Sequence, residues 1–127
     1  MKITSRTSSE IACCSDLLES VFNFGKTDVS VYYALTPGKW VKVEEISKDI
    51  GRDQSTVYRS LQKLLNMGFA MRDSGVIQSG GYYYQYTLSI SPKIDKIVKE
   101  KIDELTDKLK SLSRDLVREL ESRELLQ

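Results

Sequence analysis

The clearest hydrophobic pattern in the chain lies in residues 54–66. Its apolar residues recur every three or four positions, which is the spacing of one face of an α-helix. They are Val57, Leu61, Leu64 and Leu65. Asp53 stands directly before this segment, where its carboxylate can accept hydrogen bonds from the unpaired N–H groups of a first helical turn. The pattern therefore predicts a capped helix with one buried face.

A second amphipathic segment, residues 42–52, comes immediately before the first. Val43, Ile46 and Ile50 are expected to face inward, and Gly51 is expected to end the helix because glycine adopts the left-handed conformation at little cost. Only a tight turn then separates the two segments. The pair predicts a helix-turn-helix, with a plain helical hairpin as the alternative.

Two segments rich in β-forming residues follow, residues 69–73 and 82–88, with serines and glycines between them. They predict a β-hairpin, which after a helix-turn-helix is a wing. Alternation along the strands places Phe69, Met71, Tyr84, Tyr86 and Leu88 toward the helices, and Tyr83 and Gln85 toward solvent. The tyrosine run also fits stacking on single-stranded nucleic acid, although aromatic residues are ordinary strand formers and core fillers.

The N-terminal part is predicted to add two helices to the same body. An amphipathic helix is indicated before Gly25 by apolar residues that are expected to face inward: Ile11, Leu17, Leu18, Val21, Phe22 and Phe24. Asp28 is expected to cap another helix that ends near Leu35. Residues 1–9 are polar and are expected to fray. The chain has 127 residues and 40% hydrophobic content, which is enough to bury a core. We therefore expect one winged helix-turn-helix domain over residues 1–90.

Residues 91–127 predict one long helix, because they contain no glycine and their only proline, Pro92, fits a first helical turn. Their apolar residues alternate at spacings of four and three, which forms a heptad seam. The seam residues are Val98, Ile102, Leu105, Leu109, Leu112 and Leu116. Folding back on the same domain is one way to bury such a seam, but pairing with a second copy suits its length better. The predicted fold is mainly α with a small β-hairpin wing (α+β) and a C-terminal coiled-coil dimerisation helix.

Polar residues on and near the predicted helix 54–66 suit contacts with DNA. Arginine and glutamine can form paired hydrogen bonds to base edges, and serine, threonine and lysine suit phosphates. Residues 39–72 hold seven lysines and arginines against four acids, although the whole chain carries a net charge of only +1. The expected DNA contacts are Ser55, Thr56, Tyr58, Arg59, Gln62, Lys63, Lys42, Lys48, Arg52 and Arg72. A polar face is also the ordinary surface of an amphipathic helix, so the neighbouring elements decide between the two interpretations.

Several chemistries are disfavoured by what the sequence lacks. It contains no histidine and no glycine-rich phosphate loop followed by lysine, so we expect no enzyme, no metal site and no cofactor. Cys13 and Cys14 are adjacent, a spacing that fits neither a disulfide nor a zinc site, and we expect them to be buried. No signal peptide or membrane-spanning apolar run is evident, which predicts a cytoplasmic protein without a membrane partner.

Four pieces of residues 24–88 resemble one known family. They are Phe24–Val29 leading into Tyr32–Leu35, then Val43–Ser47, then Ser55–Leu64, and Gly68–Ala70. Together they resemble the winged-helix domain of archaeal TrmB-type regulators and of their MarR and ArsR relatives. The resemblance implies sequence-specific duplex binding, usually as a dimer. The chain departs from the family pattern in two ways. No sugar-sensing domain is expected after the winged helix, and the wing tip, residues 74–81, contains no lysine or arginine.

These observations predict a homodimeric, sequence-specific regulator of transcription that places residues 54–66 in the major groove of double-stranded DNA. Two alternatives stay open. The winged fold can dock to a protein of the transcription machinery without binding DNA. The observation that suggests this alternative is the uncharged wing tip. A small-molecule effector is also conceivable, in a pocket between the core and the C-terminal helix that is lined by Phe22, Tyr32, Tyr33 and Tyr82.

Overall fold

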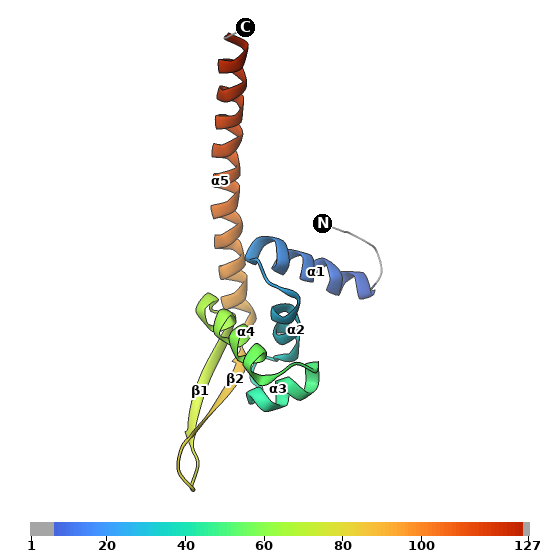
Figure 1. Ribbon diagram of the computed structural model, residues 1–127, viewed down its shortest axis with the longest axis vertical. Coiled ribbons are helices and arrows are strands. Elements are labelled where there is room, and N and C mark those ends of the chain that lie inside the picture. Colours follow the sequence, from blue (N-terminus) through green and yellow to red (C-terminus); the bar gives the residue numbers. More distant parts are fainter. Residues whose placement is uncertain (1–6, 126–127) are drawn as a thin grey trace. The chain divides into compact units, whose positions relative to one another are not determined.

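A computed structural model describes the backbone of residues 7–125 and the side chains of residues 14–125. The elements in chain order are α1 (Thr7–Phe22), α2 (Lys26–Ala34), α3 (Val43–Ile50), α4 (Gln54–Met67), β1 (Ala70–Val76), β2 (Tyr82–Leu88) and α5 (Ser91–Leu125) (Figure 1). The chain divides into two compact units, one ending at Ile94 and the other beginning at Asp95. The first unit is a winged helix-turn-helix, and a long C-terminal helix is present, as the sequence predicted.

The helix-turn-helix is made by α3 and α4. Gly51 follows α3 in the left-handed conformation, with a φ of 69°, and its N–H group donates to the Ser47 carbonyl. Asp53 caps α4, because its Oδ2 accepts from the Thr56 N–H at 3.1 Å. The predicted apolar stripe of α4 forms much of the core, with Val57, Leu61 and Leu64 fully buried. Both predicted helices are therefore confirmed, together with the residues that bound them.

The wing pairs β1 with β2 in antiparallel register, from Ala70 opposite Leu88 to Val76 opposite Tyr82. A short third segment, missed by the sequence analysis, runs beside β2. The Val41 N–H donates to the Tyr86 carbonyl at 2.9 Å, and the Tyr86 N–H donates to the Val41 carbonyl at 2.7 Å. These bonds fasten the segment before α3 to the base of the wing.

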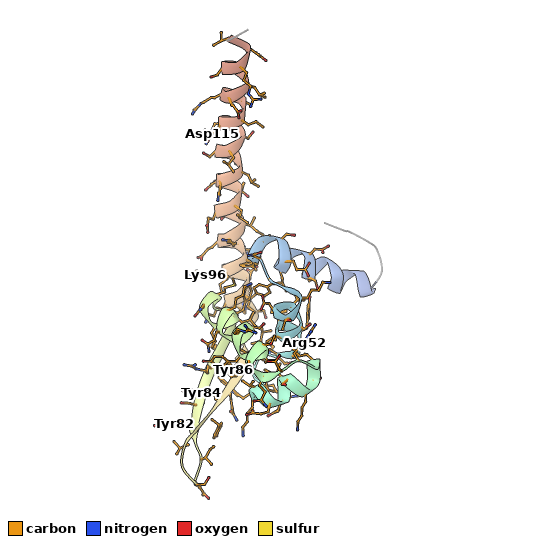
Figure 2. The ribbon with its side chains drawn as sticks, in the orientation of Figure 1. Arg52, Tyr82, Tyr84, Tyr86, Lys96 and Asp115 are labelled. Atoms are coloured by element: carbon orange, nitrogen blue, oxygen red, sulfur yellow. The ribbon has the colours of Figure 1, made fainter. Side chains whose placement is uncertain are left out.

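The predicted orientation of the wing side chains is correct in part. Phe69 and Tyr86 are fully buried as expected, whereas Met71 and Tyr84 are exposed. Strand β1 begins at Ala70, which lies on the same face as Tyr86, so Met71 falls on the opposite face. Tyr84 is on the Tyr86 face but farther out along the hairpin (Figure 2), where no helix covers it. Of the remaining predicted positions, Leu88, Tyr83 and Gln85 are half-buried.

Aromatic side chains join α1, α2 and the base of the wing. Phe69 packs edge-on against Phe22, Phe24 and Tyr32, with ring centroids between 5.0 and 6.1 Å apart. The expected inward residues Leu18, Phe22 and Phe24 are buried, whereas the side chains of Ile11 and Cys13 lie outside the described residues. Helix α1 begins at Thr7, inside the stretch that we expected to fray.

Cys14 corrects another expectation, because its side chain is exposed rather than buried. It is the eighth of the 16 residues of α1, one helical turn before Leu18. Among the described residues of α1, Leu18 is the first that is buried, so Cys14 lies before the part of the helix that joins the core.

Helix α5 has 35 residues, and Pro92 lies in its first turn as predicted. No described side chain of α5 is buried. In the predicted seam Val98 and Leu105 are half-buried, and the others are exposed: Ile102, Leu109, Leu112 and Leu116. Among the described residues, no helix is both long and apolar enough to cross a membrane.

Candidate nucleic-acid interface

The outer face of α4 presents three predicted contact residues to solvent. Ser55, Tyr58 and Arg59 are all exposed, and their spacing of three and four residues places them on one side of the helix. They line a shallow hollow between the start of α3 and the first turns of α4. Its walls are Val43, Glu44, Gln54, Ser55, Tyr58 and Arg59. An exposed arginine flanked by two hydroxyl groups matches the donors that read base edges and phosphates.

Thr56 has a local role that the sequence analysis did not assign. Its hydroxyl donates to Asp53 Oδ1 at 2.6 Å and accepts a longer hydrogen bond from Arg59 Nη2 at 3.4 Å. Hydrogen bonds from the Thr56 hydroxyl and backbone N–H lower the pKa of Asp53 below its ordinary value. Thr56 thus completes the cap of α4 and holds the guanidinium of Arg59 near the start of the helix.

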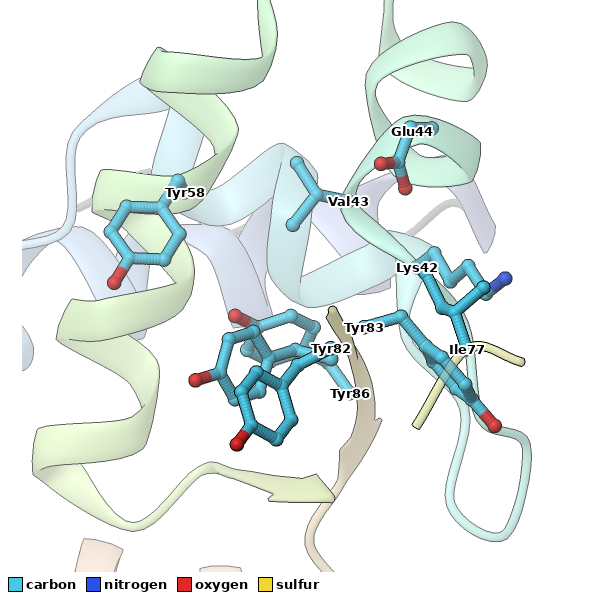
Figure 3. A pocket seen from close by; sticks show the side chains of 9 residues that line it. Lys42, Val43, Glu44, Tyr58, Ile77, Tyr82, Tyr83 and Tyr86 are labelled. Atoms are coloured by element: carbon cyan, nitrogen blue, oxygen red, sulfur yellow. The ribbon is translucent and has the colours of Figure 1, made fainter. Parts of the chain in front are cut away.

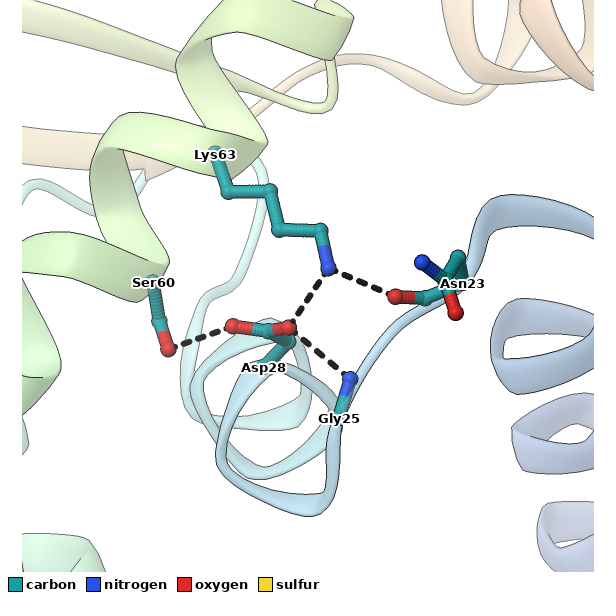
Figure 4. Close-up of polar contacts among 5 residues, drawn as sticks. All are labelled: Asn23, Gly25, Asp28, Ser60 and Lys63. Atoms are coloured by element: carbon teal, nitrogen blue, oxygen red, sulfur yellow. Dashed lines mark hydrogen bonds and ion pairs between the residues drawn. The ribbon is translucent and has the colours of Figure 1, made fainter.

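Asp28 connects α2 to α4 through a group of polar contacts (Figure 4). Its carboxylate accepts from Ser60 Oγ at 2.6 Å and from Lys63 Nζ at 2.9 Å. It also accepts from the Gly25 N–H at 2.9 Å, so it caps α2 from the third helical position rather than from the position before the helix. Lys63 Nζ donates in addition to the Asn23 carbonyl at 2.6 Å. These bonds fix how α4 sits on the domain.

The electrostatics of Asp28 agree with this geometry. Burial alone would raise the pKa of its carboxyl, but the hydrogen bonds from Ser60, Lys63 and Gly25, together with the Lys63 charge, bring the pKa below its ordinary value. The carboxylate is therefore ionised throughout the neutral range. Lys63 is the cation that compensates it.

Two predicted outer-face residues are consequently turned inward. Lys63 is tied to Asp28 and to the Asn23 carbonyl, with 32% of its side chain exposed. The Nε2 atom of Gln62 is buried, and among the described residues it has no hydrogen-bond partner. We expected Gln62 and Lys63 on the outer face of α4, but Lys63 binds the start of α2 and the loop before it, and Gln62 is half-buried. Of the contact residues predicted on α4, those that are exposed, Ser55, Tyr58 and Arg59, lie in its first two turns.

A second hollow lies between α4, the start of α3 and the wing (Figure 3). Its volume is about 520 Å³. Lys42, Val43, Glu44, Tyr58, Ile77, Tyr82, Tyr83, Tyr84 and Tyr86 line it. We call it the tyrosine groove. It contains the predicted contacts Lys42 and Tyr58 and four wing tyrosines that the prediction of DNA contacts had left out.

The remaining predicted cations, Arg72, Lys48 and Arg52, line neither of these two hollows. Arg72 lies over the Tyr84 ring, with its guanidinium carbon 4.6 Å from the ring centroid. Lys48 is exposed near the end of α3, and it lines neither hollow. Arg52 is exposed in the following turn (Figure 2) and also lines neither hollow. The structure therefore brings Arg59, Tyr58 and Lys42 into neighbouring walls and leaves Lys48 and Arg52 apart.

The aromatic residues considered for an effector pocket do not come together. Phe22 and Tyr32 pack against Phe69 in the core, and Tyr33 packs against Tyr32. Tyr82 instead stands on the wing, with 74% of its surface exposed. Among the described residues, Tyr82 thus lies apart from the other three side chains.

The Asp28 contacts were missed, although the sequence contained one signal for them. Ser60 falls within the apolar stripe of α4, between Val57 and Leu61, and its side chain is buried. A hydroxyl on a buried helix face requires a hydrogen-bond partner. The pattern indicated that a partner exists, but only the tertiary structure identifies it as Asp28.

These elements place the protein in the winged helix-turn-helix class, with a reading helix, a bracing helix and a hairpin wing. The family model described as sugar-specific transcriptional regulator TrmB matches residues 18–90. The uncharacterized protein MJ1503 of Methanocaldococcus jannaschii is 34% identical over 100 residues, which are 79% of this chain and 76% of that protein. The chain belongs to the TrmB family of winged-helix transcriptional regulators, which confirms the resemblance seen in the sequence.

Solved structures agree with this assignment. A possible transcriptional regulator from Methanosarcina mazei Go1 is 26% identical, with a TM-score of 0.74 over 80% of this chain and 87% of that chain. The S. aureus MepR-DNA complex is 20% identical, with a TM-score of 0.51 over 94% of each chain. The second likeness concerns the fold alone.

Proposed function

We propose that this regulator binds double-stranded DNA in a sequence-specific manner as a homodimer and inserts α4 into the major groove. The observation that carries the proposal is the row of Ser55, Tyr58 and Arg59, exposed on the first turns of the second helix of a helix-turn-helix. In this motif the first turns of the second helix meet the base edges. No described side chain covers this row.

Some of the proposed contact residues bind base edges, and the others bind the phosphate backbone. Arg59 has the length and the paired donors to read a guanine, and Ser55 can contact a base or an adjacent phosphate. Lys42, Lys48, Arg52 and Arg72 are cations that suit phosphates. All four lie in residues 39–72, the part of the chain in which lysine and arginine outnumber aspartate and glutamate.

Two predicted residues take an indirect part in the proposal. Lys63 supports α4 through Asp28 instead of reaching the duplex. Thr56 positions Arg59 through the 3.4 Å hydrogen bond between their side chains.

Helix α5 is the proposed dimerisation element. At 1.5 Å per residue, its 35 residues extend for about 52 Å. Four large apolar seam residues are exposed on it, and Leu109 has 65% of its surface in solvent. A second copy of the same helix offers an apolar seam of equal length, so pairing would bury both seams and give the molecule a twofold axis.

Selection of bound fragments from a random duplex library tests this proposal. The expected result is a twofold-symmetric consensus with half-sites about 34 to 36 Å apart, or a multiple of that spacing. Affinity for the selected duplex should fall steeply as salt increases, because bound cations release counterions from the DNA.

The wing tip without cations motivates the alternative of a module that docks to a protein of the transcription machinery. That role predicts no enriched sequence and no duplex affinity even in dilute buffer. Such a result would refute the DNA-binding proposal.

A further inference from the structure

We propose that the tyrosine groove is a binding site for the DNA backbone, in which neutral tyrosine hydroxyls donate hydrogen bonds to phosphates next to the base pairs that α4 contacts. The inference rests on the proposed function and deepens it. It assigns a ligand to a wing that carries no lysine or arginine at its tip.

The position of the groove identifies its occupant. It shares Val43, Glu44 and Tyr58 with the hollow that contains Arg59. The two hollows therefore adjoin each other at the start of α3 and the second turn of α4. A DNA strand whose bases meet Arg59 continues past Tyr58 into the groove, so the group that arrives there is a phosphodiester.

The chemistry of the lining suits that group. Tyr58, Tyr82 and Tyr84 expose 44%, 74% and 44% of their surfaces, so their phenol groups are accessible. Tyr86 is fully buried beneath them, and the Arg72 guanidinium lies near its hydroxyl. Burial raises the pKa of Tyr86, against the effect of the nearby Arg72 guanidinium. The Tyr86 phenol is therefore neutral at neutral pH and adds no negative charge to the groove.

Two cations are held at the sides of the groove by aromatic rings. Lys42 Nζ lies 4.6 Å from the centroid of the Tyr83 ring, and Arg72 lies at the same distance from the Tyr84 ring. Tyr83 in turn lies across Gly75, its partner in the hairpin register. A Cβ atom at Gly75 would be 2.2 Å from the Tyr83 ring, so the glycine is required for this arrangement. The positive charge beside these tyrosines therefore comes from Arg72, within β1, and from Lys42, directly before α3, and not from the wing tip.

Phenol donors predict an unusual dependence on salt. A hydrogen bond from a neutral hydroxyl contributes affinity without adding a cation to the interface, so it does not change the number of counterions released. Contacts to phosphates also carry little sequence information. Removal of the hydroxyls should weaken all duplex binding equally and leave the salt dependence unchanged.

The test compares the full-length chain with the double variant Tyr82→Phe/Tyr84→Phe, which removes two exposed hydroxyls and keeps both rings. Tyr33→Phe is the matched control, because Tyr33 is exposed to the same 44% as Tyr84 but lies on α2. Affinities are measured by fluorescence anisotropy on the selected duplex and on a random duplex, at several salt concentrations. We expect the double variant to bind both duplexes about tenfold more weakly. The slope of log affinity against log salt should stay unchanged, and Tyr33→Phe should bind like the parent.

The other outcomes overturn the inference in distinguishable ways. Parental affinity in the phenylalanine variant, with a loss only in Tyr82→Ala/Tyr84→Ala, would mean that the rings stack and that the hydroxyls are not donors. A loss confined to the selected duplex would mean that the groove reads bases. If the parent itself binds no duplex, the proposed function fails, whereas an unaffected phenylalanine variant of a binding parent refutes only the role of the groove.

Discussion

Replacement of Asp28 by asparagine is the perturbation that tests how α4 is held on the domain. The carboxylate accepts three hydrogen bonds, from Ser60 Oγ, Lys63 Nζ and the Gly25 N–H, at 2.6 to 2.9 Å. Asparagine keeps one acceptor oxygen and places an amide group where the second carboxylate oxygen was. The substitution therefore removes the charge that Lys63 faces and at least one of the three bonds.

The expected loss in the free energy of unfolding depends on the contacts of Asp28 and on how exposed Asp28 and Lys63 are. Hydrogen bonds to charged groups stabilise a fold by about 1.5 to 3 kcal/mol, and exposed ion pairs by less than about 1 kcal/mol. The Asp28 side chain is 14% exposed and that of Lys63 is 32% exposed, so solvent screens part of the attraction. We expect Asp28→Asn to lower the free energy of unfolding by about 2 kcal/mol.

The pH dependence gives the prediction a second readout. The pKa of Asp28 is below its ordinary value of 3.8 in the folded protein. Its contribution is therefore present in full above the unfolded pKa and is lost as the pH falls through the lower, folded pKa. The stability curves of the parent and of Asp28→Asn should differ at neutral pH and approach each other below about pH 4.

Urea unfolding followed by circular dichroism, at one protein concentration, measures both effects. Asp107→Asn is the control, because it makes the same chemical change at an exposed position on α5. If Asp28→Asn is no less stable than Asp107→Asn at pH 7, the contacts of Asp28 do not hold α4 in place and the reasoning is refuted.

Three further substitutions test other parts of the structure. Gly75→Ala should displace the Tyr83 ring and weaken duplex binding several-fold, with little change in unfolding, and anisotropy and urea unfolding would show both. Glu44→Gln removes a carboxylate that lines both hollows, so duplex affinity should rise. Unchanged affinity would mean that no phosphate passes Glu44. The double variant Leu105→Glu/Leu109→Glu should be monomeric in sedimentation and bind the selected duplex much more weakly; a persistent dimer would exclude the α5 seam.

The local elements of the fold were predictable because each has a local cause. Asp53 caps α4 by bonding three residues ahead, and Gly51 ends α3 by its own conformational freedom. The stripe that includes Val57 and Leu61 repeats at helical spacing. None of these features requires knowledge of the rest of the chain.

Long-range contacts explain what the sequence did not show. Lys63 looked like an outer residue, but Asp28 lies 35 positions earlier and draws its side chain inward. Met71 was placed inward by counting from Phe69, yet the strand begins one residue later and the alternation is reversed. The pairing of Val41 with Tyr86 joins segments too distant for any periodicity to reveal.

In the candidate site, too, local features were predictable and long-range ones were not. Arg59 and Tyr58 were identified because the helix alone decides which way they point. The tyrosine groove combines the start of α3, the second turn of α4 and the wing, so it exists only once these elements have packed. Its residues were visible in the sequence as a run of tyrosines, but their common surface was not.

The affinity of Arg59→Ala for the selected duplex and for a random duplex is the most direct test of the proposed α4 interface. Arg114→Ala, which removes an exposed arginine from α5, is the control. The account predicts that Arg59→Ala loses about 1 to 3 kcal/mol on the selected duplex and much less on the random one, with relaxed preference at one base pair. If Arg59→Ala binds both duplexes as Arg114→Ala does, α4 does not read DNA through this face.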